Sequence, residues 1–223
     1  SRGLGDVYKR QIVGIIFIMF TKDEKKKDIG GIFLGFAILM YGMEAMSGAV
    51  APLADNEKFT GILTMFSNPI LGLLAGTILT AVIQSSSASV GILQTLAMRG
   101  IVNWRSAIFI TLGQNIGTCI TAILSSAGAN KTAKRAAVIH LSFNVLGAAI
   151  YGVIMTIFFG IFPDLAMQHI SSTQISIFHS IFNISVTILL FPFANALVKL
   201  SGLIIREEPV EDEEEEPEEK ALR

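Results

Sequence analysis

A stretch of uncharged polar residues, 80–89 (Thr-Ala-Val-Ile-Gln-Ser-Ser-Ser-Ala-Ser), lies within a run, 69–98, that contains no charged residue. Such a run belongs in lipid or beneath other protein, where each side-chain amide or hydroxyl needs a hydrogen-bond partner. The consecutive residues 84–87 cannot share one protected face, because neighbouring side chains point all round a helix. The stretch therefore predicts a broken helix or a polar cavity, and in both cases a binding site at membrane depth.

The composition is that of a multi-pass helical membrane protein. The chain has 223 residues, of which 52% are hydrophobic, its mean hydropathy is +0.61, and apolar segments recur with few charges between them. The net charge of −1 conceals an asymmetry, because residues 207–219 hold ten of the eighteen acidic residues and the rest is basic. The single cysteine, Cys119, excludes an internal disulfide.

The two ends of the chain differ from its middle. Residues 1–11 are polar, begin without Met and lack the plan of a signal peptide, which predicts a foreign or artefactual leader. Residues 12–20 are apolar but too few to span a bilayer, and we interpret them as the remnant of an earlier transmembrane helix. The Glu-rich segment 206–223 predicts a solvated cytoplasmic linker. We therefore expect a fragment whose membrane unit occupies residues 29–205.

Long apolar segments predict an all-α integral membrane protein with about four full or partial spans. The candidate spans are residues 29–54, 106–127, 136–162 and 175–205. Basic segments at 22–27 and 131–135 are expected on the cytoplasmic side, and the connection 163–174, which has no Lys or Arg, on the outside.

This orientation constrains residues 69–98, which must begin and end on the outside. Their length suits two half-helices but not two spans, and it predicts a re-entrant hairpin with its tip near residues 84–87. Discontinuous helices of this kind occur where they line a protein-filled or water-filled cavity.

A second uncharged polar cluster occupies residues 111–121. Gly113 and Gly117 permit close approach of another helix or a break in the backbone. The residues of this cluster that supply neutral oxygens are Gln114, Asn115, Thr118 and Thr121. Spacings of three and four residues place the glutamine and both threonines on one helix face.

Together the two clusters suit a small ion that sheds its water. Na⁺ takes hydroxyl, amide and carbonyl oxygens, and the N-termini of half-helices offer N–H groups and a positive dipole end to an anion. The alternative is ordinary packing of Ser, Thr and Gly between membrane helices. That explanation is favoured for Ser89, Ser106 or Thr111 alone, but an ion-binding site is favoured for the clusters taken together.

Residues 84–88 (Gln-Ser-Ser-Ser-Ala) and 113–118 (Gly-Gln-Asn-Ile-Gly-Thr) resemble the paired signatures of the type II sodium/phosphate cotransporters and their bacterial relatives. The segments 41–46, 67–72 and 134–144 are also similar to that family. The resemblance covers roughly residues 29–205, and its motifs occur in the family's order and spacing.

The resemblance implies an inverted-repeat transporter, in which each of two repeats carries its own Gln-Ser-Ser-Ser hairpin. This chain has one such hairpin and resembles the C-terminal repeat, which in bacterial members precedes an acidic linker and a soluble PhoU-like domain. The implied partners are the missing first repeat, a PhoU-like domain and the lipid bilayer. The chain departs from the family pattern at Gln114, where smaller residues are usual, and at Cys119, where threonine is common.

The activity that the resemblance implies is sodium-coupled symport of inorganic phosphate across the bacterial cytoplasmic membrane. Na⁺ is the coupling ion, and no other cofactor is expected. The residues implied in phosphate or ion binding are Gln84, Ser85, Ser86, Ser87, Gln114, Asn115, Thr118 and Thr121, of which Gln84, Ser86, Thr118 and Thr121 would hold Na⁺. Only Arg99 and Arg105, at the hairpin base, bring fixed positive charge near the motifs. Bound Na⁺ would therefore supply the charge that phosphate needs.

Further polar residues lie inside the apolar segments. Glu44 is a candidate because a charged residue in a span is functional by default, although a packing role is equally compatible. His140 and His179 each begin a copy of His-x-x-Phe-Asn that ends at Asn144 or Asn183. For these four residues, hydrogen bonds between helices are favoured over a proton relay or ligand binding.

Other function classes find less support. A channel or a structural membrane subunit is an alternative that uptake measurements distinguish from a transporter. An intramembrane serine hydrolase is less favoured, because the chain has no Gly-x-Ser-x-Gly elbow, no His-Glu-x-x-His and no acidic residue near the serines. The basic segments are short and follow from topology, so nucleic acid is not an expected partner. The protein is not expected to be an enzyme.

Overall fold

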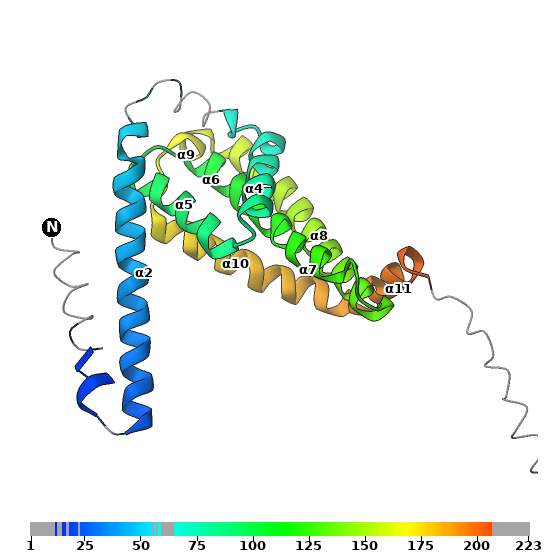
Figure 1. Cartoon of the computed structure of the whole chain (residues 1–223). Coiled ribbons are helices and arrows are strands. Elements are labelled where there is room, and N and C mark those ends of the chain that lie inside the picture. The colour runs from blue at the N-terminus through cyan, green and yellow to red at the C-terminus, as the bar shows by residue number, and fades with distance from the viewer. Residues whose placement is uncertain are drawn as a thin grey trace, which may run out of the picture.

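The structure is a computed structural model that describes residues 12, 15–16, 18–21, 23–54, 56, 58 and 65–206. The predicted leader 1–11 and the linker from residue 207 onward lie outside the described residues. The helices are α2 (Glu24–Ala54), α4 (Pro69–Ile83), α5 (Ser86–Met98), α6 (Trp104–Gly117), α7 (Cys119–Ser126), α8 (Lys131–Ile161), α9 (Pro163–Met167), α10 (Ser172–Leu190), the 3₁₀ turn η1 (Phe191–Phe193) and α11 (Ala194–Ile204) (Figure 1).

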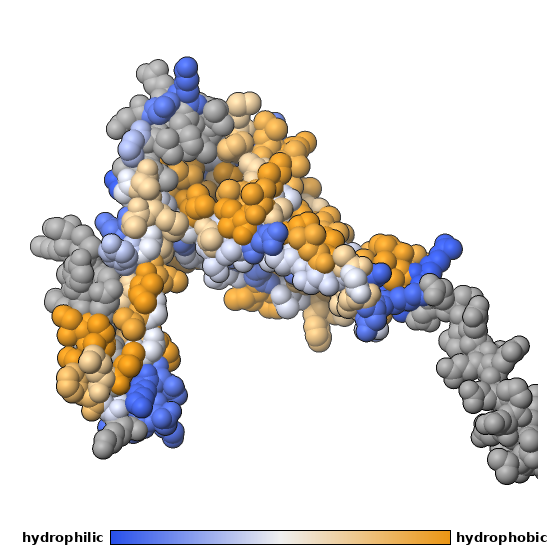
Figure 2. All heavy atoms as spheres, in the orientation of Figure 1, coloured by the Kyte–Doolittle hydropathy of each residue, from blue (hydrophilic) through white to orange (hydrophobic). Residues whose placement is uncertain are grey.

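The predicted fold class, an all-α membrane protein, is confirmed. Among the residues that the structure describes, four helical segments are long and apolar enough to cross a membrane, namely Glu24–Met46, Trp104–Ser126, Lys131–Ile161 and Ser172–Ile204. Apolar side chains cover much of the surface in Figure 2, while hydrophilic residues gather at helix ends such as the start of α2. Within the described residues, extended pairing is limited to one isolated bridge between Asn103 and His169.

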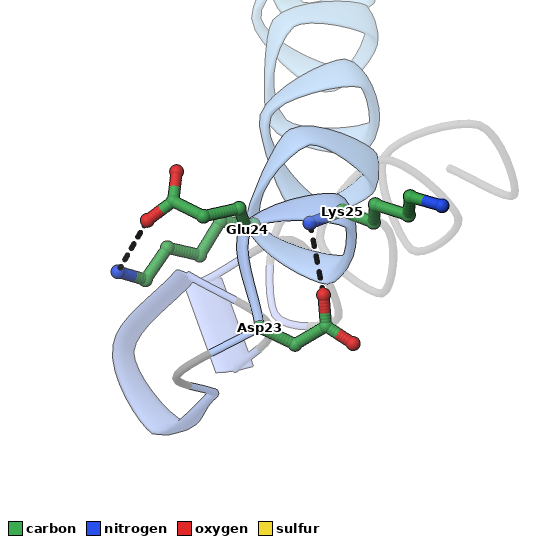
Figure 3. A network of polar contacts seen from close by, with 4 residues as sticks. Asp23, Glu24 and Lys25 are labelled. Carbon is green, nitrogen blue, oxygen red and sulfur yellow. Dashed lines mark hydrogen bonds and ion pairs between the residues drawn. The ribbon is translucent and has the colours of Figure 1, made fainter.

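The basic segments, which lie outside the predicted spans 29–54 and 136–162, contain the first turns of α2 and α8. The side chain of Asn130 accepts a hydrogen bond from the Ala133 amide at 2.9 Å, so α8 begins at Lys131 rather than at 136. At the start of α2 the Asp23 carboxylate accepts from the Lys25 amide at 3.0 Å, while Glu24 pairs with the Lys27 ammonium at 3.8 Å (Figure 3). Side-chain caps therefore extend both helices into the basic segments.

The predicted break in residues 69–98 is confirmed, because α4 ends at Ile83 and α5 begins at Ser86. The base of this hairpin lies beside the connection that contains α9. The side-chain Nδ2 of Asn103 donates to Ser67 Oγ, and the backbone N–H of Trp104 donates to the backbone carbonyl of Gln168. At the other end of the molecule, Arg135 Nε donates to the Ile205 carbonyl at 3.0 Å. In Figure 1 the hairpin base lies near α9 at the top, while the basic starts of α2 and α8 lie lower, at the left and at the right of the view.

Helix α6 is the centre of the structure. Every residue from 106 to 115 is buried, because α4, α5, α8 and α10 surround this helix. Its apolar side chains, including Phe109 and Leu112, pack against Phe159 of α8 and Phe182 of α10. By contrast, α2 makes its main contact with α5 and is largely exposed. A helix that is enclosed on all sides fixes the position of every polar group it carries.

Helices α4 and α6 touch through their backbones. A Cβ atom at Gly76 would lie 2.0 Å from the Ile110 carbonyl oxygen, and one at Gly113 would lie 1.9 Å from the Leu73 carbonyl oxygen. Gly72 and Gly117 extend the same contact by one turn in each direction. Small residues four apart allow this approach, which is a common source of stability between membrane helices.

We expect Gly113→Ala to destabilise the protein by about 3 kcal/mol, because its methyl group would overlap the α4 backbone, which cannot rotate away. Thermal unfolding of the detergent-purified protein measures the effect. The matched control is Gly152→Ala in α8, where nothing lies within 4 Å of the added carbon. That change should be neutral or stabilising by up to about 1 kcal/mol. Equal melting temperatures for the two variants would contradict the backbone contact.

Candidate functional site

The tip of the hairpin is a two-residue interruption between helices. Gln84 has a left-handed backbone with φ 55°, and its amide donates to the Thr80 carbonyl, which closes α4. Ser85 is extended, and its hydroxyl oxygen accepts from the Ala88 amide at 3.3 Å, which caps α5. Serine is a favoured N-cap because its oxygen replaces a missing backbone acceptor. The serine run therefore stops one helix and starts the next.

The predicted hairpin residues all gather at this tip. Ser86 and Ser87 form the first turn of α5, where backbone N–H groups lack acceptors within the helix. Gln84 and Ser87 are exposed, whereas Ser85 and Ser86 are half-buried. The helix dipole places positive potential at this end, so the tip offers amide donors and hydroxyl groups to an anion.

A buried polar cluster lies below the tip, where α4, α5 and α6 meet. Thr80 Oγ1 donates to Ser89 Oγ at 2.7 Å, and Gln114 Nε2 donates to both Ser89 Oγ and the Ser89 carbonyl at 2.9 Å. The three residues are at most 1% exposed. Gln114 Oε1 is buried and makes no hydrogen bond. The amide therefore fixes the hairpin to α6 through one end and leaves an unpaired acceptor at the other.

The junction of α6 and α7 lies beside the hairpin. A Cβ atom at Gly117 would be 3.2 Å from the Ala81 amide nitrogen, in the last turn of α4. Thr118 follows Gly117 directly, and its hydroxyl donates to the backbone carbonyl of Gln114 at 2.9 Å. The Thr121 hydroxyl donates to the Thr118 carbonyl at 3.0 Å. Both hydroxyl protons are used locally, so the hydroxyl oxygens keep lone pairs for a cation.

The remaining candidate site residues make their contacts away from the hairpin tip. The Asn115 side chain bonds within α6 and to α10: its Nδ2 donates to the Thr111 carbonyl, and its Oδ1 lies 3.4 Å from His179 Nε2 of α10. The Asn144 and Asn183 amides donate to the carbonyls of His140 and His179 within their own helices. His140 lines a cavity of about 370 Å³ between α7 and α8.

Glu44 is exposed on α2. The pocket between α2 and α5 is lined by its neighbours Met43 and Met46, together with Ser87 and Gln94, and not by Glu44. Helix α2 thus approaches the hairpin without bringing this carboxylate to the tip.

The potential ion ligands that the hairpin and the α6–α7 junction bring together are uncharged groups. Within the part of the chain that the structure describes, no group of three or more His, Cys, Asp or Glu side chains could hold a metal ion. Hydroxyl, amide and carbonyl oxygens beside a helix N-terminus suit a weakly bound monovalent cation and an anion. The chemistry available here is therefore binding and release.

Two residues of the buried cluster were not among the predicted ligands. Thr80 precedes Gln84 by four residues, and Ser89 follows Ser85 by four. Once the helix is known to break at the tip, these positions face each other one turn below it on the two arms. The spacing was therefore visible in the sequence, but its meaning depended on locating the break.

Comparisons with known proteins confirm the family resemblance. The family described as Na+/Pi-cotransporter matches residues 38–189. The chain is 31% identical over 195 residues to "Uncharacterized protein YqeW" of Bacillus subtilis, covering 87% of this chain and 63% of that protein. It is 25% identical over 206 residues to "Putative inorganic phosphate export protein YjbB" of Escherichia coli, covering 92% of this chain and 38% of that protein.

A mammalian relative matches a shorter part. The chain is 37% identical over 119 residues to "Sodium-dependent phosphate transport protein 2A" of Rattus norvegicus, covering 51% of this chain and 18% of that protein. The chain therefore spans less than two thirds of the length of each of these relatives. No solved structure matches it significantly.

We expect Gln84→Gly to be more stable than Gln84→Ala by about 1 kcal/mol, because a left-handed backbone is costly for residues with a Cβ atom. The order should reverse at Ser87, a helical position, where Gly should be less stable than Ala by up to about 1 kcal/mol. Melting temperatures of the four purified variants measure both differences. A Gln84→Ala variant as stable as Gln84→Gly would exclude the left-handed tip.

Proposed function

Because this chain belongs to the Na+/Pi-cotransporter family, we propose that the protein containing it moves inorganic phosphate across a membrane together with Na⁺. The hairpin α4–α5 and the α6–α7 junction form this chain's share of the binding site. A family of cotransporters is a family of transporters rather than enzymes. The serines of the hairpin accordingly bind and do not act as nucleophiles.

The unpaired side-chain oxygen of Gln114, Oε1, is the observation that carries this proposal. Its side chain is 1% exposed, and its Oε1 atom accepts no hydrogen bond. A buried acceptor without a partner costs about 1–3 kcal/mol, so such atoms call for a bound group. A Na⁺ ion beneath the tip would occupy this position and use oxygens that are already fixed.

We assign the roles from the geometry of the two motifs. The half-buried Ser86, Thr118 and Thr121, with Gln84 and Gln114, supply neutral oxygens to Na⁺. The first-turn amides of α5, with Ser85 and Ser87, receive phosphate oxygens. The Asn115 amide supports α6 through the Thr111 carbonyl and on the side that meets His179 of α10.

The coupling of phosphate transport to Na⁺ follows from the lack of positive charge at the hairpin tip. The tip residues carry no fixed positive charge, so an anion is stabilised there only by the helix dipole and by bound cations. Phosphate therefore binds tightly only after Na⁺ has bound, and the two move together. The direction of net flux is set by the Na⁺ and phosphate gradients.

We propose that the protein lies in a bacterial cytoplasmic membrane; the basic starts of α2 and α8, which the positive-inside rule assigns to the cytoplasmic side, support this orientation. Residues 29–205 constitute one repeat, and a second repeat of opposite orientation completes the site against the tip. Residues 206–223 link this unit to a PhoU-like domain. The exposed apolar helix α2 has the surface that lipid or a second repeat requires.

Radiolabelled phosphate uptake into vesicles with an imposed Na⁺ gradient tests the proposal, using the native gene product that carries this segment. We expect sodium-dependent uptake to fall at least about tenfold in Gln114→Leu, Ser86→Ala and Thr118→Val, because each loses an oxygen ligand. The matched control is Thr156→Val on α8, whose hydroxyl also donates to the carbonyl four residues earlier but faces outward. That variant should transport normally.

Phosphate uptake by the wild-type protein that does not depend on the Na⁺ gradient would reject sodium coupling. Uptake that survives all three substitutions would mean that the hairpin serves packing alone. An equal loss in Thr156→Val would show that removing such a hydroxyl from any helix disturbs the fold, and the site assignment would then fall.

A further inference from the structure

His179 reaches the second motif from a helix far along the chain. Its Nε2 atom lies 3.4 Å from Asn115 Oδ1, although the two residues are 64 positions apart. Asn115 is 7% exposed, and its Nδ2 already donates to the Thr111 carbonyl at 2.9 Å. Asn115 thus presents an acceptor to the ring, which donates to it in the tautomer that carries the proton on Nε2. His179 therefore donates, and the asparagine amide is held at both ends.

The helix that carries His179 is itself fixed by polar contacts to its neighbours. Ser176 Oγ, one turn earlier, accepts from Gln94 Nε2 of α5 at 2.6 Å. Ser185, further along α10, is hydrogen-bonded to Tyr151 of α8. His179 lies between these two contacts and faces α6. Its ring position is therefore set by α5, α6 and α8 together, which is the arrangement that an orienting group requires.

The other copy of the His-x-x-Phe-Asn motif provides an internal comparison. In both copies the asparagine amide donates to the histidine carbonyl four residues earlier, at 3.0 Å for His140 and 2.8 Å for His179. Both histidine carbonyls therefore accept from the asparagine of their own copy, and the His140 carbonyl also accepts from the Cys119 thiol at 3.6 Å. The surroundings of the two residues differ, because His140 lines the cavity between α7 and α8, whereas the His179 ring contacts Asn115.

We propose that His179 is a positioning residue that orients Asn115 and, through it, the turn of α6 that carries Gln114 and leads to Thr118. This inference rests on the proposed function and adds a residue of α10 to it. Without the N–H of His179, Asn115 Oδ1 would be a buried acceptor with no partner, directly after the unpaired Gln114 Oε1. Asn115 would then turn to find another donor, and the neighbouring cation ligands would move with it.

The test uses two substitutions of nearly equal shape at each histidine. Gln places an N–H near the position of Nε2, whereas Met has similar length and no donor. We expect His179→Met to raise the Na⁺ concentration for half-maximal phosphate uptake about tenfold, as loss of an outer-shell partner does at other metal sites. His179→Gln should stay within about twofold of wild type, and Gln and Met at His140 should not differ. The measurement uses the native gene product in vesicles.

A second readout is the rise in melting temperature that Na⁺ produces in the purified protein, which reports binding without transport. It should shrink in His179→Met and persist in His179→Gln. Equal behaviour of the two variants at position 179 would overturn the positioning role, as would an equal loss at position 140. Gln114→Leu is included because it separates the two proposals.

If Gln114→Leu loses sodium dependence while the two variants at 179 agree, only the role of His179 fails. If uptake by the wild type does not depend on Na⁺, or if it survives Gln114→Leu, Ser86→Ala and Thr118→Val alike, the proposed function fails and this inference fails with it. A His179→Met protein that cannot be purified, while His140→Met can, would indicate a role in folding and would also overturn the positioning role.

Discussion

The backbone contact between α4 and α6 is the interaction on which the rest of the structure depends. At Gly76 and Gly113 the helices approach so closely that a single Cβ atom would overlap the opposite backbone. Thr77 adds a hydrogen bond across the contact, from its hydroxyl to the Gly113 carbonyl at 3.1 Å. Membrane helices gain little from the hydrophobic effect in lipid, so close packing of this kind supplies much of their association energy. It makes α4 a fixed arm of the hairpin.

The second arm, α5, is held differently. Its contacts with neighbours include side-chain hydrogen bonds, from Gln114 to Ser89 and from Gln94 to Ser176. A cavity of about 580 Å³ separates part of it from α4, and one of about 410 Å³ lies between it and α2. Polar contacts of this type are specific in direction but modest in energy. The hairpin thus combines one arm in backbone contact with α6 and one arm held by apolar side chains, among them Leu93 and Leu96, and by a few directional hydrogen bonds.

The sequence predicted much of the fold because its strongest signals are local. A charge-free run long enough for two half-helices, with four polar residues at its centre, predicted the break that is found between Ile83 and Ser86. The predicted starts of two helices, at residues 29 and 136, were wrong, because the caps Asp23 and Asn130 extend α2 and α8 into the lysine-rich segments before them. A single side-chain cap near 1 kcal/mol is enough to move such a boundary by a turn.

The sequence by itself determined the class of the protein, the place of the hairpin and the family, since hydropathy, charge and motif spacing are properties of neighbouring residues. Tertiary structure alone decided which polar groups meet. Gln114 bonds to Ser89 across 25 residues, and Asn115 faces His179 across 64. It also left Gln114 Oε1 buried without a partner. Partners at such separations depend on how helices rotate and cross, and a buried amide gives no local sign of which neighbour will accept its proton.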